Sequence, residues 1–176
     1  MTWLPSRVRG QFYYLYMVED LYSRFGVSWE VFQSESAYFT RSVIDRAMWR
    51  QTFVMSPPVL HTDNDSVFKA QTVAQKLYDL GIKPCRSRPR VSNDNAYIES
   101  MFRSLKYCPS WPSQGFESLS AARDWVENFM QWYNHEHKHS GIGFATPAQR
   151  HSGEDKVILA NRQKVYERAK AARPDR

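Results

Sequence analysis

Apolar residues change from an unbroken run to an alternating pattern within the first third of the chain. The run Gln11–Val18 (QFYYLYMV) is short, almost wholly apolar and rich in aromatics, which predicts a strand buried on both faces. Residues 20–26 have a turn-forming composition, and Val27–Phe32 then alternates apolar and polar side chains as a half-buried strand does. Together these segments predict a β-hairpin.

Further along the chain, apolar residues recur at the spacing of a helix. This spacing predicts helices at 36–50, 70–80, 96–106 and 118–134, followed by a polar, basic helix at 154–172. Val59–His61 and Ile82–Cys85 predict two short strands. The order of elements is that of an α/β fold with an antiparallel hairpin at one end. A mixed sheet of this kind needs another strand before the hairpin, and only Met1–Pro5 is available for it.

The same spacing predicts which faces of two helices are buried. The predicted core residues are Ile98, Phe102 and Leu105 in the 96–106 helix, and Ala122, Trp125, Phe129 and Trp132 in the 118–134 helix. Glu99 lies off the first of these stripes. Arg103 and Lys106 follow it at i+4 and i+7, so the three share one face. A carboxylate followed by two cations suits a metal ion beside a phosphodiester.

Asp63 lies where a predicted strand ends and a polar turn begins, in LHTDNDS. Carboxylates at the carboxyl ends of strands project into the crevice in which α/β folds bind their ligands. Asp63 and Glu99 are therefore candidate metal-binding residues. From these residues alone a second interpretation stays open, in which Asp63 forms a turn and Glu99 favours a helix N-terminus.

The segments around these two residues resemble a known family. Asp63 in LHTDND and, after 35 intervening residues, Glu99 in SNDNAYIESMFRSLKY resemble the D-x35-E half of the retroviral-integrase-like DDE recombinases. The similarity is greatest to transposases of bacterial insertion sequences. The hairpin FYYLYMVEDLYSRFGVSWEV and the closing segment FMQWYNHEHKHSGIGFATPAQR are similar to that family as well. The resemblance covers about residues 2–150.

This resemblance implies a ribonuclease-H-like fold, an α/β fold whose mixed sheet is flanked by helices. It also implies DNA transposition or integration, in which Asp63 and Glu99 hold two Mg²⁺ ions (Mn²⁺ can substitute) for cleavage and transfer of DNA strands. Arg103 and Lys106 match positions at which basic side chains approach the element's DNA end, and Asn93 lies in the loop before that helix. The implied partners are DNA, as transposon ends and target, and a second copy or a full-length transposase.

One part of the family pattern has no match in this sequence. The family's first Asp lies in a W-x-x-D-I-T pattern, which would place it just before the opening residues Met1-Thr2-Trp3-Leu4-Pro5. We therefore expect an N-terminally truncated catalytic core whose first strand is mostly missing. Asp20 is a candidate substitute for that first Asp, although it matches a different position of the family.

Two functions follow and both stay open. One is an active polynucleotidyl transferase that obtains its first acidic ligand from Asp20 or from another chain. The other is a catalytically inactive transposase remnant that only binds DNA or a transposase partner. Two carboxylates hold two divalent ions poorly, which favours the remnant for this chain on its own.

The balance of charge indicates a polyanionic partner. The chain has 24 Lys and Arg against 18 Asp and Glu, a formal net charge of +6 and a pI near 9.4. Arg86, Arg88 and Arg90 lie in the loop that leads into the helix with Glu99. We predict that this loop contacts the DNA backbone, without regard to sequence and with strong dependence on salt. A solvated basic face is the alternative.

Composition excludes several other classes of protein. Apolar residues make up 42% of the 176, with 10 Tyr, 10 Phe and 6 Trp, which excludes a disordered chain. Two cysteines cannot form a disulfide scaffold. No apolar run approaches the ~20 residues of a membrane helix, and no signal peptide is evident, so we expect a cytoplasmic protein. We expect a catalytic core at residues 1–150 and a basic helix or tail at 151–176.

The segment His135–His139 (HEHKH) matches the H-E-x-x-H signature of zinc metalloproteases. That signature needs one continuous helix, so that both histidines face the metal. Here the helix is predicted to end at Asn134, and Gly141 follows soon afterwards. We therefore expect a polar surface turn rather than a zinc site.

Overall fold

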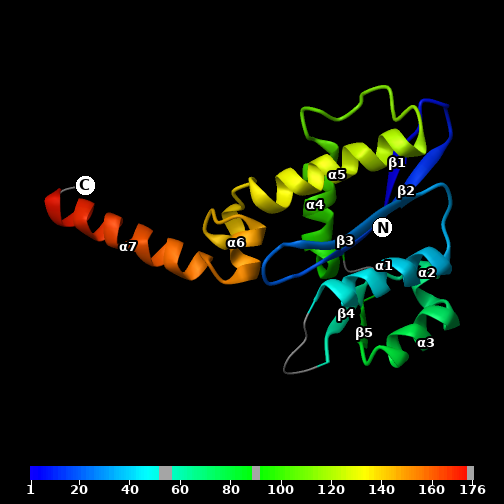
Figure 1. Ribbon diagram of the computed structural model, residues 1–176, viewed down its shortest axis with the longest axis horizontal. Coiled ribbons are helices and arrows are strands. Elements are labelled where there is room, and N and C mark those ends of the chain that lie inside the picture. The colour runs from blue at the N-terminus through cyan, green and yellow to red at the C-terminus, as the bar shows by residue number, and fades with distance from the viewer. Residues whose placement is uncertain (52–56, 89–91, 174–176) are drawn as a thin grey trace. The chain divides into compact units, whose positions relative to one another are not determined.

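A computed structural model describes residues 1–51, 57–88 and 92–173 (Figure 1). The chain forms two compact units. Unit 1 comprises Met1–Glu19 and Val27–Glu127, and unit 2 comprises Asp20–Gly26 and Asn128–Arg176. The division of the chain into a catalytic core at 1–150 and a basic helix or tail at 151–176 stays a prediction.

The strands form two small sheets. In the first, β2 (Phe12–Glu19) lies between β1 (Thr2–Pro5) and β3 (Gly26–Phe32), and β1 pairs antiparallel with β2. In the second, β4 (Val59–Thr62) pairs parallel with β5 (Lys83–Arg86). The predicted strands are confirmed, and their directions are mixed as expected. Within the described residues, however, no strand pairing joins the two sheets into one.

The burial of β2 differs from the prediction. Only Leu15 and Tyr16 are buried in this strand, and Phe12 at its start is 39% exposed. The ring of Phe12 lies against that of the exposed Trp3 in β1, with 5.5 Å between ring centroids. An aromatic run can thus shield itself by contacts between rings on a partly open face, so the prediction of burial on both faces is wrong for most of β2.

One buried apolar cluster of unit 1 lies between α1 (Ala37–Arg50), α3 (Gln71–Asp79) and the β4–β5 sheet (Figure 1). It consists of Ile44, Val73, Leu77 and Ile82. α1 begins after Ser36, whose hydroxyl accepts a hydrogen bond from the N–H of Tyr38 at 3.2 Å, as an N-cap does. A short helix, α2 (Ser66–Lys69), precedes α3 and was not predicted.

The helices expected at 96–106 and 118–134 were predicted with different success. The helix α4 (Ala96–Lys106) has the predicted bounds and follows a 3-10 turn, η1 (Ser92–Asn95). It buries Phe102 and Leu105 as expected and also Met101, whereas Ile98 is half-buried. The buried face of α4 is therefore slightly wider than the predicted stripe.

The helix α5 (Leu119–His135) runs from unit 1 into unit 2. Its buried apolar residues are Ala122, Val126, Phe129, Met130 and Tyr133. Trp132 is 38% exposed, so its assignment to the core is wrong. Trp125 is half-buried against the rings of Trp111 and Phe116, at 5.4 and 5.7 Å between centroids, and its indole N–H donates to the carbonyl of Ser110. Aliphatic side chains and the rings of Phe129 and Tyr133 fill the core, and the indoles lie at its margin.

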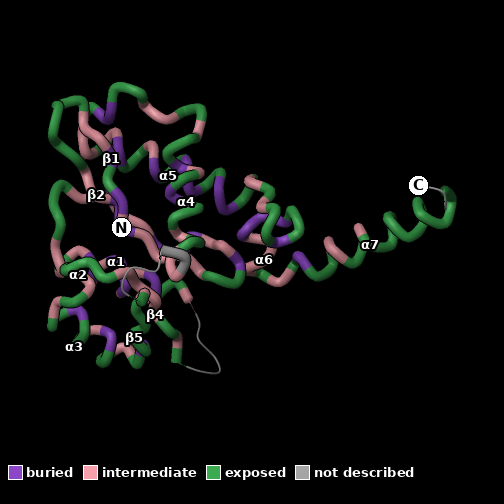
Figure 2. Tube along the Cα trace, turned by 180° about the vertical axis from the view of Figure 1, so that it is seen from behind, coloured by how far each residue is buried: buried purple, intermediate pink, exposed green. Residues whose placement is uncertain are grey.

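Unit 2 contains η2 (Ser140–Ile142), α6 (Pro147–Ser152) and α7 (Asp155–Ala172). α6 begins with a capping box, in which Thr146 and Gln149 each bond the other's backbone N–H. The predicted basic helix is confirmed as α7. From residue 163 onward every described residue of this helix is exposed (Figure 2).

The turn Asp20–Gly26 belongs to unit 2 because Asn134 holds its end. The side-chain amide of Asn134 donates to the carbonyl of Gly26 at 3.0 Å and accepts from its N–H at 2.9 Å. A Cβ atom at position 26 would lie 2.1 Å from the terminal methyl of Met130, so a side chain there would force Met130 to move.

Among the described residues, no helix is both long and apolar enough to cross a lipid bilayer.

Candidate functional site

Asp63 is the first residue after β4, and the end of this strand is held by side chains as well as by its ladder. The N–H of Ser87 extends the pairing by donating to the carbonyl of Thr62 at 2.9 Å. The imidazole of His61 connects the two strands, with Nε2 at 3.1 Å from the Ser87 hydroxyl and Nδ1 at 3.2 Å from the Cys85 sulfur. The backbone that positions Asp63 is therefore braced on both strands.

The turn after β4 leaves most of the Asp63 carboxylate available. Its Oδ1 accepts one hydrogen bond, from the N–H of Asp65 at 3.2 Å, which is the usual bond of an Asp-initiated turn. The amide of Asn64 donates to the carbonyl of Ser87 at 2.7 Å and fastens the turn to the residue after β5. Asp63 is half-buried and Asp65 is exposed.

Glu99 is in the first turn of α4, and its side chain is exposed. Arg103 and Lys106 are exposed as well, on the same side of the helix by their spacing. The opposite side of α4 is anchored in the core by Met101 and Leu105, which are 1% and 0% exposed. The core thus sets the orientation of the three charged side chains.

Asp63 and Glu99 line one open pocket of about 400 Å³. The complete lining is Met1, Thr2, Asp63, Asn95, Ile98, Glu99, Phe102, Arg103, Lys106 and Tyr107. The structure therefore brings together four of the residues that the sequence singled out, two acidic and two basic. Their roles in binding metal and DNA remain predictions.

The donor set of this pocket fits a hard divalent cation. Carboxylate oxygens are the ligands that Mg²⁺ and Mn²⁺ prefer in proteins. Burial lowers the pKa of the α-amino group of Met1, which also lines this pocket. The negative charges of Asp63, Asp65 and Glu35 oppose this shift. No group of three His, Cys, Asp or Glu side chains in the part of the chain that the structure describes is arranged to hold a metal.

The basic loop before α4 is braced by an ion pair. The carboxylate of Asp94 accepts from the N–H of Arg88 at 2.8 Å and from its guanidinium at 2.8 and 3.0 Å. These bonds from Arg88 lower the pKa of Asp94 to about 2 and raise the pKa of Arg88. Arg88, predicted to contact DNA, is thus paired with Asp94 within the loop.

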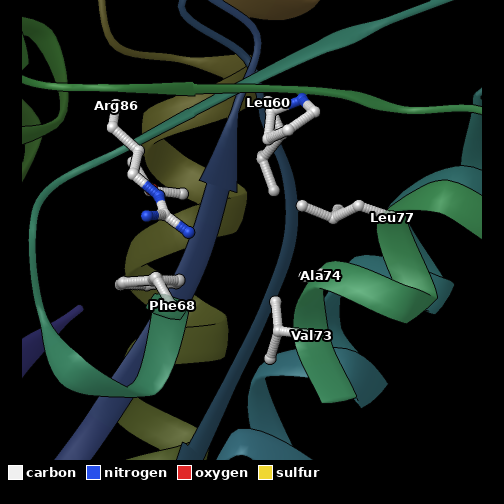
Figure 3. A pocket seen from close by; sticks show the side chains of 8 residues that line it. Leu60, Phe68, Val73, Ala74, Leu77 and Arg86 are labelled. Carbon is white, nitrogen blue, oxygen red and sulfur yellow. The ribbon is translucent and has the colours of Figure 1, made fainter. Parts of the chain in front are cut away.

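Arg86, also predicted to contact DNA, does not line the pocket of Asp63 and Glu99. Arg86 lines a second, apolar pocket, where its guanidinium points toward Phe68 and Leu77 lies on the opposite wall (Figure 3). That cavity of about 40 Å³ has room for little more than a water molecule. Asn93 lies in η1 before α4, and Arg90 lies outside the described residues.

Asp20 does not line the pocket of Asp63 and Glu99, and it belongs to unit 2. Its carboxylate accepts from the N–H and hydroxyl of Ser23 and from the N–H of Tyr22, and lies 3.3 Å from Nδ1 of His151. Burial alone would raise the pKa of Asp20, but these hydrogen bonds outweigh it and lower that pKa. Since the carboxylate is occupied by its own turn, the structure argues against Asp20 as a substitute metal ligand.

The HEHKH segment does not form one helix. α5 ends at His135, and Nδ1 of His139 accepts the N–H of Gly141 at 3.1 Å as the cap of η2. His137 stacks on Tyr133, with 5.4 Å between ring centroids. Burial lowers the pKa of both His137 and His139. The two histidines of the protease signature therefore do not share a helical face.

Two residues of the site were not found from the sequence. Tyr107 lines the pocket although it follows the last residue of α4, and His61 connects the strands that position Asp63. The parallel pairing of β4 with β5 would have indicated His61, because His61 lies opposite Cys85 in that register. The spacing of apolar residues contains no signal for Tyr107.

Sequence comparison identifies two matching families, both described as integrase core domain. One matches residues 1–92, just over half of the chain, and the other matches residues 80–147. The first match contains Asp63 and the second contains Glu99. Together they span the whole of the pocket lining.

Individual relatives are proteins of bacterial insertion sequences. Transposase InsF of insertion sequence IS3A from Escherichia coli K12 is 28% identical over 137 residues, which cover 77% of this chain and 47% of InsF. InsK of the IS150 element from the same organism is 27% identical over 127 residues, covering 72% of this chain and 44% of InsK. The chain spans about half the length of the curated relatives it matches.

Among solved structures, a chain of the simian T-cell lymphotropic virus intasome, determined by cryo-electron microscopy with a regulatory subunit of PP2A, has a similar fold. The TM-score is 0.62 at 16% sequence identity, and the match covers 85% of this chain and 51% of the viral complex's chain. At this identity the similarity concerns the fold, which is the mixed α/β arrangement expected from the sequence.

Proposed function

This chain belongs to the integrase core domain family, and on that premise we propose that it acts on DNA as part of the catalytic core of an insertion-sequence transposase. The observation that supports this most directly is the shared pocket of Asp63, at the end of β4, and Glu99, in the first turn of α4. Two elements far apart in the sequence bring a pair of carboxylates to one place. If Asp63 only formed a turn and Glu99 only favoured a helix N-terminus, the two carboxylates would have no reason to share a pocket.

In the proposed mechanism, Asp63 and Glu99 would hold a divalent cation through their carboxylate oxygens. When bound, such a cation supplies Lewis acidity to a phosphodiester. Asp63 has one hydrogen bond, to the N–H of Asp65, which orients the carboxylate and leaves lone pairs for the ion. A further acidic ligand, which the family pattern requires, would come from outside the described lining of the pocket.

Arg103 and Lys106 would bind the DNA phosphates next to that cation. Both are exposed, both line the pocket, and both follow Glu99 on the same face of α4. The guanidinium of Arg103 can bond two oxygens of one phosphate, whereas the ammonium of Lys106 acts as a point charge. Neither contact distinguishes one base from another, so this surface positions DNA without reading its sequence.

The catalytic part of the proposal is tested by nicking of a supercoiled plasmid in the presence of Mn²⁺. We expect activity in the wild-type chain to fall to background in Asp63→Asn and in Glu99→Gln. Asp124→Asn, which alters an exposed carboxylate on α5 outside the pocket, is the matched control and should retain the activity. Binding of Mn²⁺ to the same four proteins, followed by paramagnetic resonance, should fall in the two pocket variants only.

These outcomes separate the two functions suggested by the sequence. If the wild-type chain binds DNA and Mn²⁺ but shows no nicking above background, the protein is a binding remnant and the catalytic proposal is wrong. Equal nicking by all four proteins would place the activity outside this pocket.

The DNA contacts are tested by the salt dependence of duplex binding. Each phosphate contact contributes about 0.9 to the slope of log K against log salt concentration. The double variant Arg103→Ala/Lys106→Ala should therefore lower that slope by about 2. Lys83→Ala removes an exposed cation on β5 that lines neither pocket, and it should leave the slope unchanged. Equal slopes in the wild type and the double variant would refute the contacts.

A further inference from the structure

Tyr107 is an exposed aromatic side chain at the edge of the pocket that contains Asp63 and Glu99. It is the residue that ends α4, where its N–H donates to the carbonyl of Arg103 at 3.0 Å. The side chain is 80% exposed although it lines the pocket. The phenol hydroxyl makes no hydrogen bond to any residue that the structure describes. Nothing in the packing of α4, whose buried face is formed by Met101, Phe102 and Leu105, requires a ring at this position.

The ring of Tyr107 is paired with the cation that precedes it by four residues. The guanidinium carbon of Arg103 lies 5.7 Å from the ring centroid, within the range of a cation–π contact. One face of the ring is thus associated with a guanidinium that can bind a phosphate. The other face remains available for a flat partner. A ring and a phosphate-binding cation beside each other match the two parts of a nucleotide, its base and its backbone.

Exposure alone would not distinguish this residue, because the chain has other exposed tyrosines. Tyr78 on α3, for example, is 82% exposed, but it lines neither pocket. What sets Tyr107 apart is its place beside two carboxylates and two cations. Tyr78 is therefore a natural control, since it has the same side chain and the same exposure without the surrounding site.

We propose that Tyr107, paired with Arg103, is a stacking subsite for an unpaired nucleobase of the DNA that enters this pocket. The proposal rests on the proposed function, because it presupposes that DNA binds at Asp63 and Glu99. Within a duplex each base is covered on both faces by its neighbours, so an aromatic side chain can stack only on a base that is unpaired or terminal. The class of ligand is accordingly DNA with an unpaired end next to the phosphate held by Arg103 and Lys106.

The experiment compares two DNAs of the same sequence with the full chain. One ends in a short unpaired overhang with the fluorescent base 2-aminopurine at its first position, and the other is fully paired, with its strands joined at each end by a linker that carries no base. Anisotropy measures the dissociation constant, and the 2-aminopurine intensity reports stacking. We expect the wild type to bind the overhang about tenfold more tightly and to quench its fluorescence, because one base–aromatic stack typically contributes about that much.

Three variants separate stacking from other effects. Tyr107→Ala should lose both the preference for the overhang and the quenching, while its binding of the closed duplex stays within about twofold of the wild type. Tyr107→Phe keeps the ring and should retain both. Tyr78→Ala should behave as the wild type does. Mn²⁺ binding should be unchanged in all three, which shows that the pocket itself is intact.

Each of the following outcomes would overturn the stacking subsite. If the wild type binds both DNAs equally, or if Tyr107→Ala keeps the full preference, the stacking subsite is wrong while DNA binding at the pocket stands. If Tyr107→Ala weakens both DNAs alike, the ring supports the surface but does not stack on an unpaired base, and the proposal is again wrong. If the wild type binds neither DNA, the proposed function fails and the subsite fails with it.

Discussion

Two aspartates of this chain each follow the end of a strand, and their surroundings are opposite. Asp20 follows β2, and its carboxylate accepts three hydrogen bonds from Tyr22 and Ser23 and contacts His151. Asp63 follows β4, accepts one hydrogen bond from the N–H of Asp65, and faces an open pocket with Glu99. The oxygens of the Asp20 carboxylate are hydrogen-bonded within its own turn, whereas the Asp63 carboxylate keeps lone pairs without a protein partner.

This difference teaches how to recognise a functional carboxylate. Both residues initiate a turn, so position after a strand does not separate them. The number of oxygen lone pairs left without a protein partner does, because a metal or a substrate needs those lone pairs. The same reasoning identifies the carboxylate of Asp94 as structural, since Arg88 donates three hydrogen bonds to it.

The largest difference between the two aspartates is expected in the stability of their alanine variants. We expect Asp20→Ala to lower the free energy of unfolding by about 2 kcal/mol, because it removes charged hydrogen bonds and leaves the fully buried hydroxyl of Ser23 with fewer partners. Asp63→Ala should change it by less than about 0.5 kcal/mol. Urea denaturation of the two variants and the wild type measures both values, and equal losses would show that the two carboxylates are not distinct.

The pH dependence of the Asp20 contribution has a defined sign. Because the folded state lowers the pKa of Asp20, its stabilisation is fully present above the ordinary value of 3.8 and is lost as the pH falls through the lower, folded value. The difference in stability between the wild type and Asp20→Ala should accordingly shrink on acidification. A difference that stays constant from neutral to strongly acidic pH would contradict the assignment.

A smaller effect is expected at the helix that positions His151, the partner of Asp20. Thr146 is 2% exposed and caps α6 through a hydrogen bond from the N–H of Gln149 at 3.2 Å. Thr146→Ala should cost about 1 kcal/mol, the usual loss for an N-cap. Thermal unfolding followed by circular dichroism measures this, with Thr146→Ser as the variant that keeps the cap. If serine fails to restore stability, the hydroxyl is not what matters.

The smallest effect concerns the half-buried Asp94 in its pair with the exposed Arg88. Its pKa of about 2 lies below the ordinary 3.8, so the carboxylate stays ionised below pH 3.8 and the pair is lost as the pH falls through about 2. Titration of the Asp94 carboxyl carbon by nuclear magnetic resonance should give the low value in the wild type and a pKa raised toward 3.8 in Arg88→Gln, which keeps only the backbone N–H bond of residue 88. No movement between the two proteins would show that Arg88 is not the cause.

The local elements were largely predictable from residue order. The helix 96–106 has its predicted bounds, and the strands at 59–62 and 83–86 and the basic helix at 155–172 are within one residue or so of expectation. These elements follow from hydrophobic period and from breakers such as Gly81, whose φ of +67° ends α3 in the left-handed region that glycine favours. Such signals lie in neighbouring residues and need no knowledge of the rest of the chain.

Burial within elements was less predictable. In α5 the apolar spacing suggested Trp125 and Trp132, yet the buried positions include Val126, Met130 and Tyr133. All of these residues are apolar, so the sequence pattern admits more than one stripe, and the packing partners select among them. The aromatic run of β2 was ambiguous for the same reason, since rings occur both in cores and on shielded open faces.

The candidate site likewise has residues that the sequence identified and residues that only the folded structure revealed. Asp63 and Glu99 were identifiable from the residues themselves, because their types, their positions beside a strand end and a helix start, and their resemblance to a family are all written in the chain. Only the tertiary structure showed three further points. Tyr107 lines the same pocket, His61 braces the strand that positions Asp63, and the carboxylate of Asp20 is hydrogen-bonded within its own turn. Hydrophobic period and turn chemistry are properties of adjacent residues. The partners of a side chain are set by which distant segments the folded core brings within hydrogen-bonding distance.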